Sequence, residues 1–194
     1  MKLTVQHQES NSRGELLLRT FFGGFYILLP HGLAMIFPSI WAAILGFLAF
    51  WVVLFTGSYP KGWFEYQVKL MKWSLRINAR FLNLVDGYPA FGKDGTDDKT
   101  NIEVDYPEEL SRGTLLLRAF FGIFYCYLPH GFLLFFKAIW IAIQGFIAFW
   151  VVLFTGTFPE SFHESIVGYF RWTTRLSLYM GNMTDVYPPF NGKE

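Results

Sequence analysis

The chain has 194 residues, of which 53% are hydrophobic, 21% aromatic and only 16% charged, with a mean hydropathy of +0.30. A formal net charge of +1 does not indicate nucleic-acid binding, and a soluble domain of this size does not normally gather its apolar residues into long uncharged runs. The composition therefore predicts a membrane protein. Its single cysteine, Cys126, has no partner for an internal disulfide.

The chain is an internal duplication. A shift of 99 residues aligns its two halves without a gap from Ser12 to Pro89, and about half of the aligned positions are identical. Both halves are therefore expected to share one fold. We predict a first membrane repeat at 1–92, a polar linker at 93–111 and a second membrane repeat at 112–194.

The first repeat opens with a polar leader and then an apolar segment. Leu3-Thr4-Val5 alternates in polarity and is echoed by Ile102-Glu103-Val104, so both pieces are candidate strands. The following segment, residues 16–37, is apolar except for Arg19 and His31. Arg19 lies close to the segment's start, from which its head group can reach back to the membrane surface. No cleavable signal peptide is expected, because no small-residue cleavage site follows.

The apolar block of each repeat is long enough for two spans. Pro30 predicts a bend in the first span, and Pro38-Ser39, like Lys137-Ala138 in the second repeat, stands where a helical hairpin would turn. Ile40 to Thr56 then forms the second span, and it returns almost intact as residues 139–155. An alternative treats residues 16–29 as an interfacial helix and 33–55 as one span.

An amphipathic basic helix is predicted after each apolar block. Gly57 and Pro60 form a stop and restart signal, so a new helix should begin near Lys61. Basic residues recur along it at helical spacing beside apolar flanks, a pattern typical of a helix that lies on an anionic membrane surface. The predicted lipid contacts on the two equivalent helices are Lys69, Lys72, Trp73, Arg76, Arg80, Arg171, Trp172 and Arg175. The alternative is a solvated basic face.

The fold class predicted from these elements is an all-α membrane protein with two tandem repeats. Each repeat is a transmembrane helical hairpin followed by an amphipathic interfacial helix, with short extended segments in the leader and the linker. Basic residues flank both ends of each hairpin, which places both termini in the cytoplasm and the internal two-fold axis along the membrane normal. Gly46 and Gly145 are the predicted helix-packing positions.

Two histidines are the only candidates for metal chemistry, although no metal site is predicted. His31 and His130 are repeat equivalents within apolar segments, and facing imidazoles could hold a metal, relay a proton or ligate haem. The structural alternative is that each histidine donates to a carbonyl that the adjacent proline frees. Asp86 and Asp185 are expected to pair with Arg76 and Arg175 or to cap a turn.

The motif set resembles a known bacterial family. Pro30-His31, Phe55 to Pro60, Trp73 to Arg76 and Asp86 to Phe91, all repeated in the second half, are similar to the membrane domain of unknown function catalogued under the number four-three-eight-nine. The resemblance covers nearly the whole chain in two tandem copies. It implies a bacterial membrane protein and supplies no activity.

The function expected from the sequence is that of a non-enzymatic integral protein of the bacterial inner membrane, an accessory or assembly subunit of a larger complex. Its expected partners are membrane lipids and either another membrane protein or further copies of the chain, with no cofactor. Two alternatives remain open: an oligomeric carrier or channel for an apolar or lipid-like solute, and a membrane redox or metal protein that depends on histidine.

Overall fold

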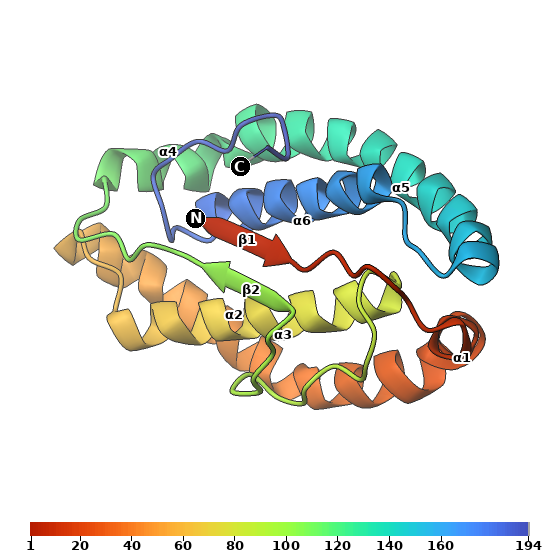
Figure 1. Ribbon diagram of the computed structural model, residues 1–194. Coiled ribbons are helices and arrows are strands. Elements are labelled where there is room, and N and C mark those ends of the chain that lie inside the picture. The colour runs from red at the N-terminus through yellow and green to blue at the C-terminus, as the bar shows by residue number, and fades with distance from the viewer. Residues whose placement is uncertain (194) are drawn as a thin grey trace.

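The computed structural model describes residues 1–193 and consists of two equivalent helical repeats joined by a small β-ribbon (Figure 1). The elements of the first repeat are β1 (Lys2–Val5), α1 (Arg13–Gly23), the π-helix η1 (Gly24–Leu28), α2 (Leu29–Thr56) and α3 (Lys61–Phe81). Those of the second repeat are β2 (Thr100–Glu103), α4 (Arg112–Gly122), the π-helix η2 (Ile123–Tyr127), α5 (Leu128–Thr155) and α6 (Glu160–Met180). The candidate strands of leader and linker are thus confirmed.

Each apolar block is one continuous helix, so the predicted hairpins are wrong. The segments α1, η1 and α2 run together over the 44 residues Arg13–Thr56, and α4, η2 and α5 do the same over Arg112–Thr155. We call these the two long helices. Pro38-Ser39 and Lys137-Ala138 lie inside them. The alternative with separate segments also fails, because the helix is not broken between them.

The reason is local backbone chemistry at the expected turn. A single proline removes one hydrogen bond from a helix without reversing the chain, and the reversal instead follows Thr56. There Gly57 adopts the left-handed conformation (φ 78°) and its N–H bonds to the Val53 carbonyl. Lys137 is not at a chain reversal, and its ammonium donates to the Ser165 hydroxyl of α6 at 2.9 Å.

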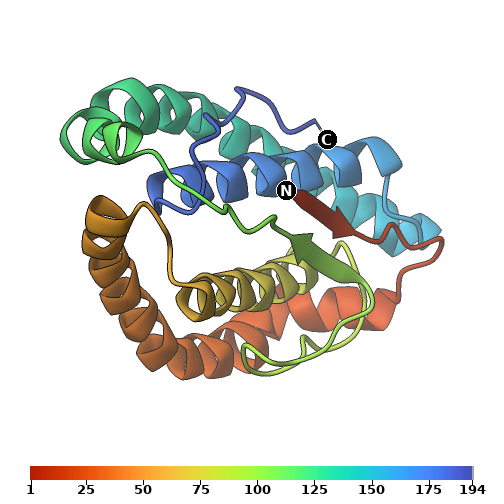
Figure 2. The same cartoon turned by 90° about the vertical axis from the view of Figure 1, so that its left-hand side faces the viewer.

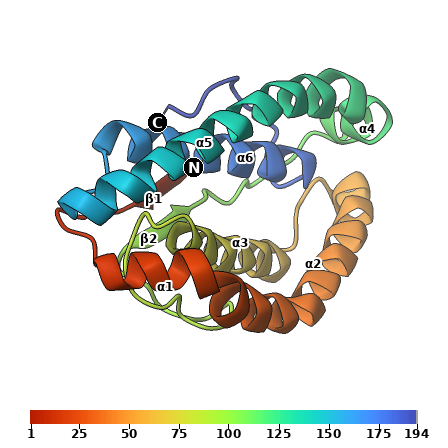
Figure 3. The same ribbon diagram turned by 90° about the vertical axis from the view of Figure 1, so that its right-hand side faces the viewer.

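The predicted irregularity near Pro30 takes the form of a π-helix. The N–H of Leu29 bonds to the carbonyl of Gly24, five residues earlier, directly before the proline that cannot donate. The second repeat has the same feature at the same place, where Leu128 bonds to Ile123. Both long helices curve strongly along their length, as Figures 2 and 3 show for α2 and α5.

The two long helices join end to end in a closed hoop. Arg13 at the start of the first donates to the Phe154 carbonyl at the end of the second (3.0 Å), and Arg112 donates to the Phe55 carbonyl (3.1 Å). Backbone bonds beside them tie Asn11 to Gly156 and Leu110 to Gly57. These contacts are reciprocal between equivalent residues, which is the signature of two-fold symmetry.

The β-ribbon lies on this pseudo-two-fold axis. β1 and β2 pair antiparallel with Leu3 opposite Ile102, its own repeat equivalent. Both side chains are buried, at 1% exposure, in a core that also takes residues from α3, α5 and α6. In Figure 1 the hoop forms the upper and lower edges of the molecule, while α3, α6 and the ribbon lie between them.

The position of α3 and α6 corrects the prediction of exposed surface helices. Each packs along the inner side of its own long helix, with α3 against α2 and α6 against α5, and each buries most of its C-terminal half. Each long helix therefore buries a mixed face that includes an arginine, a histidine and aliphatic residues, and it leaves most of its phenylalanine and tryptophan side chains exposed.

Candidate functional site

The motifs of the first repeat meet in a buried cluster around His31. The His31 side chain is fully buried, and its Nδ1 accepts a hydrogen bond from the Trp73 indole Nε1–H at 2.9 Å. The Phe91 ring stacks on the imidazole with centroids 4.1 Å apart, and the Tyr88 ring lies 5.3 Å away. Residues far apart in the sequence are thus brought together from α2, from α3 and from Asp86 to Phe91. We call this last motif, and its equivalent at 185–190, the closing segment or closing motif of the repeat.

The second repeat builds the same cluster around His130. Trp172 donates to His130 Nδ1 at 2.7 Å, Phe190 stacks at 3.9 Å, and Tyr187 lies at 5.4 Å. Each histidine is enclosed by side chains of its own repeat. The two imidazoles therefore do not face each other across the axis, as the metal or haem hypothesis required.

The hydrogen bond fixes the state of each imidazole. An indole N–H can only donate, so Nδ1 must offer its lone pair, and in the neutral ring the proton stands on Nε2. Both Nε2 atoms are buried without a hydrogen-bond partner in the described part of the chain. A metal could use Nδ1 only by displacing the tryptophan. The geometry thus favours a structural role for His31 and His130.

The carbonyl freed by the proline is taken by a tyrosine, not by the histidine. Tyr26 stands four residues before Pro30, which has no N–H to give it, and the Tyr88 hydroxyl donates to the Tyr26 carbonyl at 3.0 Å. Tyr187 donates to the Tyr125 carbonyl in the same way. This role of Tyr88 and Tyr187 was not predicted from the sequence, where the four-residue offset from each proline marks the free carbonyl but not its partner.

The aspartates of the closing motif pair with the arginines inside the long helices. Asp86 Oδ1 accepts from the Arg19 guanidinium at 2.6 Å, and its Oδ2 accepts from the backbone N–H of Ser12 at 2.7 Å. Asp185 holds Arg118 and the N–H of Ser111 in the same manner. The expected pairing with Arg76 and Arg175 is therefore wrong: each aspartate pairs with an arginine of its long helix and also accepts from the backbone N–H at the start of that helix. The partners are different from those predicted, because the arginines are buried within the hoop and not directed to a membrane surface.

The basic stripe of α3 is mostly turned inward. Trp73, Arg76 and Arg80 are buried, whereas Lys69 is exposed and Lys72 half-buried. Arg76 donates to the carbonyls of the loop after α3, at Gly95 (2.7 Å) and Gly92 (2.5 Å). These three residues are therefore not available as exposed lipid contacts.

Arg80 of α3 forms a buried ion pair with Asp97 of the linker. Its guanidinium makes two bonds to the Asp97 carboxylate, at 2.5 and 2.8 Å, and both side chains are buried. Burial alone would raise the pKa of Asp97, but the bonds from Arg80 and Thr100 outweigh burial and hold it below its usual value. On the surface nearby, bonds from Lys69 and Lys93 lower the pKa of Asp94 to about 2.

The predicted lipid contacts of α6 also bond to other parts of the chain. Arg171 is buried, with bonds to the Leu3 carbonyl at 3.2 Å and to Glu164 at 2.5 Å. Trp172 is buried against His130, and Arg175 donates to the Lys193 carbonyl at 2.7 Å. Of the eight predicted lipid contacts, Lys69, Lys72 and Arg175 are still exposed or half-buried. Lys69 and Lys72 line a surface groove of about 280 Å³ together with Lys61, and Arg175 lines another of about 350 Å³.

Gly46 and Gly145 differ in what they face. A Cβ at Gly46 would lie 3.7 Å from the Gln67 amide of α3, so this glycine is a packing position. Space is open within 4 Å of Gly145. It lines a crevice of about 600 Å³ between α1, the end of α3 and α5, together with residues that include Phe21, Phe146 and Trp150.

No family model, curated protein or solved structure matches the chain. The resemblance to the bacterial membrane family therefore stays a prediction. Within residues 1–193 there is also no group of three or more His, Cys, Asp or Glu placed to hold a metal ion.

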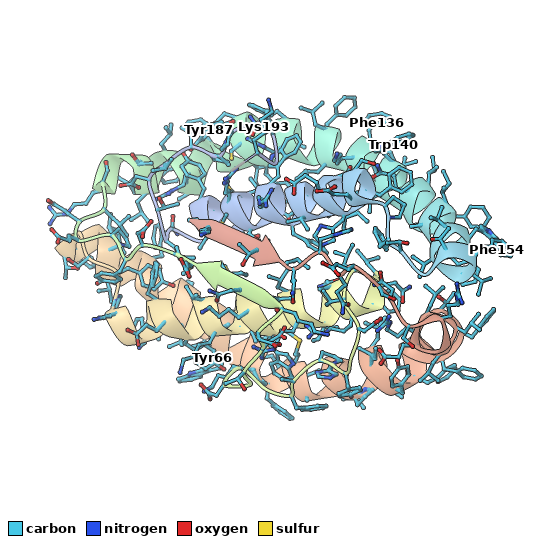
Figure 4. All side chains as sticks on the ribbon, viewed as in Figure 1. Tyr66, Phe136, Trp140, Phe154, Tyr187 and Lys193 are labelled. Carbon is cyan, nitrogen blue, oxygen red and sulfur yellow. The ribbon has the colours of Figure 1, made fainter. Side chains whose placement is uncertain are left out.

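The long helices expose many large apolar side chains. Phe136, Trp140 and Phe154 lie along α5 in Figure 4, and their side chains are 53%, 52% and 73% exposed. Large apolar residues are exposed in the same way along both long helices, and we call this surface the apolar rim. Examples from the first long helix are Leu17, Phe21, Phe37, Ile40, Trp41, Ile44, Phe47, Trp51 and Phe55.

Proposed function

We propose that the chain is a non-enzymatic protein of the bacterial inner membrane, an accessory or assembly subunit of a larger complex, and a member of the membrane family that its motifs resemble. The observation that carries this proposal is the apolar rim. In the most apolar 18-residue stretch of each long helix only 22% of the residues are buried. The core helix of a soluble protein would instead be largely covered.

The extent of the rim supports contact with lipid. Soluble monomers rarely expose a contiguous apolar patch of more than a few hundred Å². Here aromatic side chains such as Phe37, at 80% exposure, and Phe55, at 73%, recur over two helices of 44 residues each. The surface lysines Lys69 and Lys72 remain candidate contacts for anionic head groups, since both line one groove with an apolar floor.

A structural role is supported by the way the polar motifs are used. His31 is occupied by Trp73, Arg19 by Asp86, and the Tyr88 hydroxyl by a backbone carbonyl. Each pairing links the closing segment or the inner helix to the long helix. These motifs therefore stabilise the curved shape of each repeat, which leaves the apolar rim as the surface for partners.

Membrane residence and assembly are tested together. Membranes from cells that express the tagged chain are washed with alkaline carbonate and then treated with a bifunctional crosslinker before purification in mild detergent. The proposal expects the chain to remain in the washed membranes and to appear in a crosslinked species of defined larger mass. Release by carbonate would refute the membrane location, and a lone crosslinked monomer would refute the role as a subunit.

A second candidate function is the binding or carriage of a lipid-like solute. The crevice beside Gly145 favours it, because its lining is mostly apolar, with five aromatic side chains, and its volume of about 600 Å³ lies in the range of known ligand sites. Mass spectrometry of the purified protein should then find a lipid that is retained through washing and lost in Gly145→Leu. Gly46→Ala, at a packed position, is the matched control. Equal lipid content in all three proteins would refute this candidate.

A further inference from the structure

We infer that the hoop lies flat within one leaflet of the bilayer, so that both long helices run in the plane of the membrane and neither crosses it. This inference rests on the proposed membrane location. It adds a definite partner for the apolar rim, namely the acyl chains of a single leaflet, and a definite orientation of the two-fold axis along the membrane normal.

The length of the rim is the first argument. Exposed apolar residues extend from Leu17 to Phe55, which at 1.5 Å per residue is about 58 Å of helix. The hydrocarbon core of a bilayer is only about 30 Å thick. A helix that crossed it once would leave about half of this apolar surface outside the hydrocarbon. A helix that lies in the plane covers all of it.

The thickness of the hoop is the second argument. An α-helix with its side chains measures about 10–12 Å across, and half of the hydrocarbon core is about 15 Å. A helix that lies in the plane of the membrane therefore fits within a single leaflet. Exposed positions at successive offsets along α2, such as Ile40, Trp41, Ala43 and Ile44, spread over an arc of about 160° of the helix circumference, because each residue turns the helix by about 100°. Such a helix has room for lipid both beside it and beneath it.

The place of the charges is the third argument, and it excludes the spanning orientation. If each long helix crossed the membrane, the two polar junctions of the hoop would mark its two surfaces. The β-ribbon lies on the two-fold axis, equally far from both junctions. Its exposed residues Lys2 and Glu103, which stand opposite each other in the ribbon, and the neighbouring Asp105, which pairs with the Met1 ammonium at 3.5 Å, would then lie at the bilayer midplane, where charged groups are costly.

The in-plane orientation removes this conflict. Both junctions are then at the same depth, near the head groups, where Arg13 and Arg112 can remain hydrated. In Figure 1 the β-ribbon and the linker that leads into it lie on the viewer's side of α3, between the two long helices. These polar segments together form the face directed to water.

Depth measurement by spin labelling tests the inference. Single cysteines are placed at Leu17, Phe37 and Phe55, the start, middle and end of one exposed arc, in a Cys126→Ala background. The labelled proteins are reconstituted into phospholipid vesicles, and depth is obtained from collision with oxygen and with a water-soluble nickel complex. Leu116, Phe136 and Phe154 give a matched series in the second repeat, and Glu103→Cys is the aqueous control.

Each orientation gives a different pattern of depths. The in-plane hoop predicts that all three labels lie in one leaflet at depths that agree within about one helical turn, 5.4 Å. A crossing helix would place Leu17 and Phe55 near opposite surfaces with Phe37 between them, and a hairpin would place Phe37 alone at the far surface. Either pattern would overturn the inference while leaving the membrane location intact. Labels that all respond only to nickel would instead refute the membrane location itself.

Discussion

The bond between Trp73 and His31 offers the sharpest test of how each repeat holds its shape. In Trp73→Phe the imidazole Nδ1 loses its donor at a site where both side chains are at most 2% exposed. Leaving a buried acceptor unpaired costs about 1–3 kcal/mol, and the smaller ring adds about 1 kcal/mol for lost packing. We therefore expect the free energy of unfolding to fall by about 2–4 kcal/mol.

The measurement is unfolding by titration with a denaturing detergent, followed by near-ultraviolet circular dichroism in mild micelles. Trp172→Phe, with the equivalent bond of 2.7 Å in the second repeat, should lose a similar amount. Trp41→Phe is the control on the rim, where the side chain is 50% exposed, and a change within about 0.5 kcal/mol is expected. A loss in Trp73→Phe no larger than that in Trp41→Phe would refute the role assigned to the cluster.

Three further predictions address the linker, the helix end and the former hairpin position. Asp97→Asn should release the linker segment that the ion pair with Arg80 holds against α3. Acid should have the same effect on the wild type. Because the pKa of Asp97 is lowered in the fold, the stabilisation from this pair is complete above the ordinary value of 3.8 and is lost as the pH falls through the lowered pKa. Limited proteolysis of the linker against pH measures both effects, and a pH-independent cleavage rate would contradict them. Gly57→Ala should cost about 1–2 kcal/mol of unfolding free energy, because φ is 78° there. Gly62→Ala, in the first turn of α3 where space is open around the added Cβ, should instead be stabilising by about 0.4–1 kcal/mol. Equal thermal shifts of the two variants would refute this difference. Lys137→Met should change unfolding free energy by no more than about 1.5 kcal/mol, since one hydrogen bond to α6 is lost, and failure of the variant to enter membranes would instead restore the far-surface role.

Much of each repeat could be predicted from local patterns. The duplication, the two candidate strands, the stop at Gly57 and the new helix at Lys61 all appear in the structure. These features depend on backbone preferences and on apolar composition within a few residues, so they are legible without knowledge of the partners.

The partners of the polar residues could not be predicted in this way. A stripe of Lys, Arg and Trp has the same spacing whether it faces lipid phosphate or a loop of its own chain. The arginines of α3 face their own chain because Asp97 and the carbonyls of Gly92 and Gly95 bind them. These groups belong to a loop 16 to 19 residues further on. Arg19 likewise pairs with Asp86, 67 residues away, whereas the sequence pattern predicted that it reaches the membrane surface.

The sequence by itself determined that the chain is a tandem repeat of long apolar segments, because composition and periodicity are properties of the chain alone. Only the tertiary structure decided that each segment is one curved helix and not a hairpin. Nothing at Pro38-Ser39 compels a reversal or forbids one. The choice depends on the inner helix that each long helix packs around and on the ends of the other repeat, to which Arg13 and Arg112 attach it.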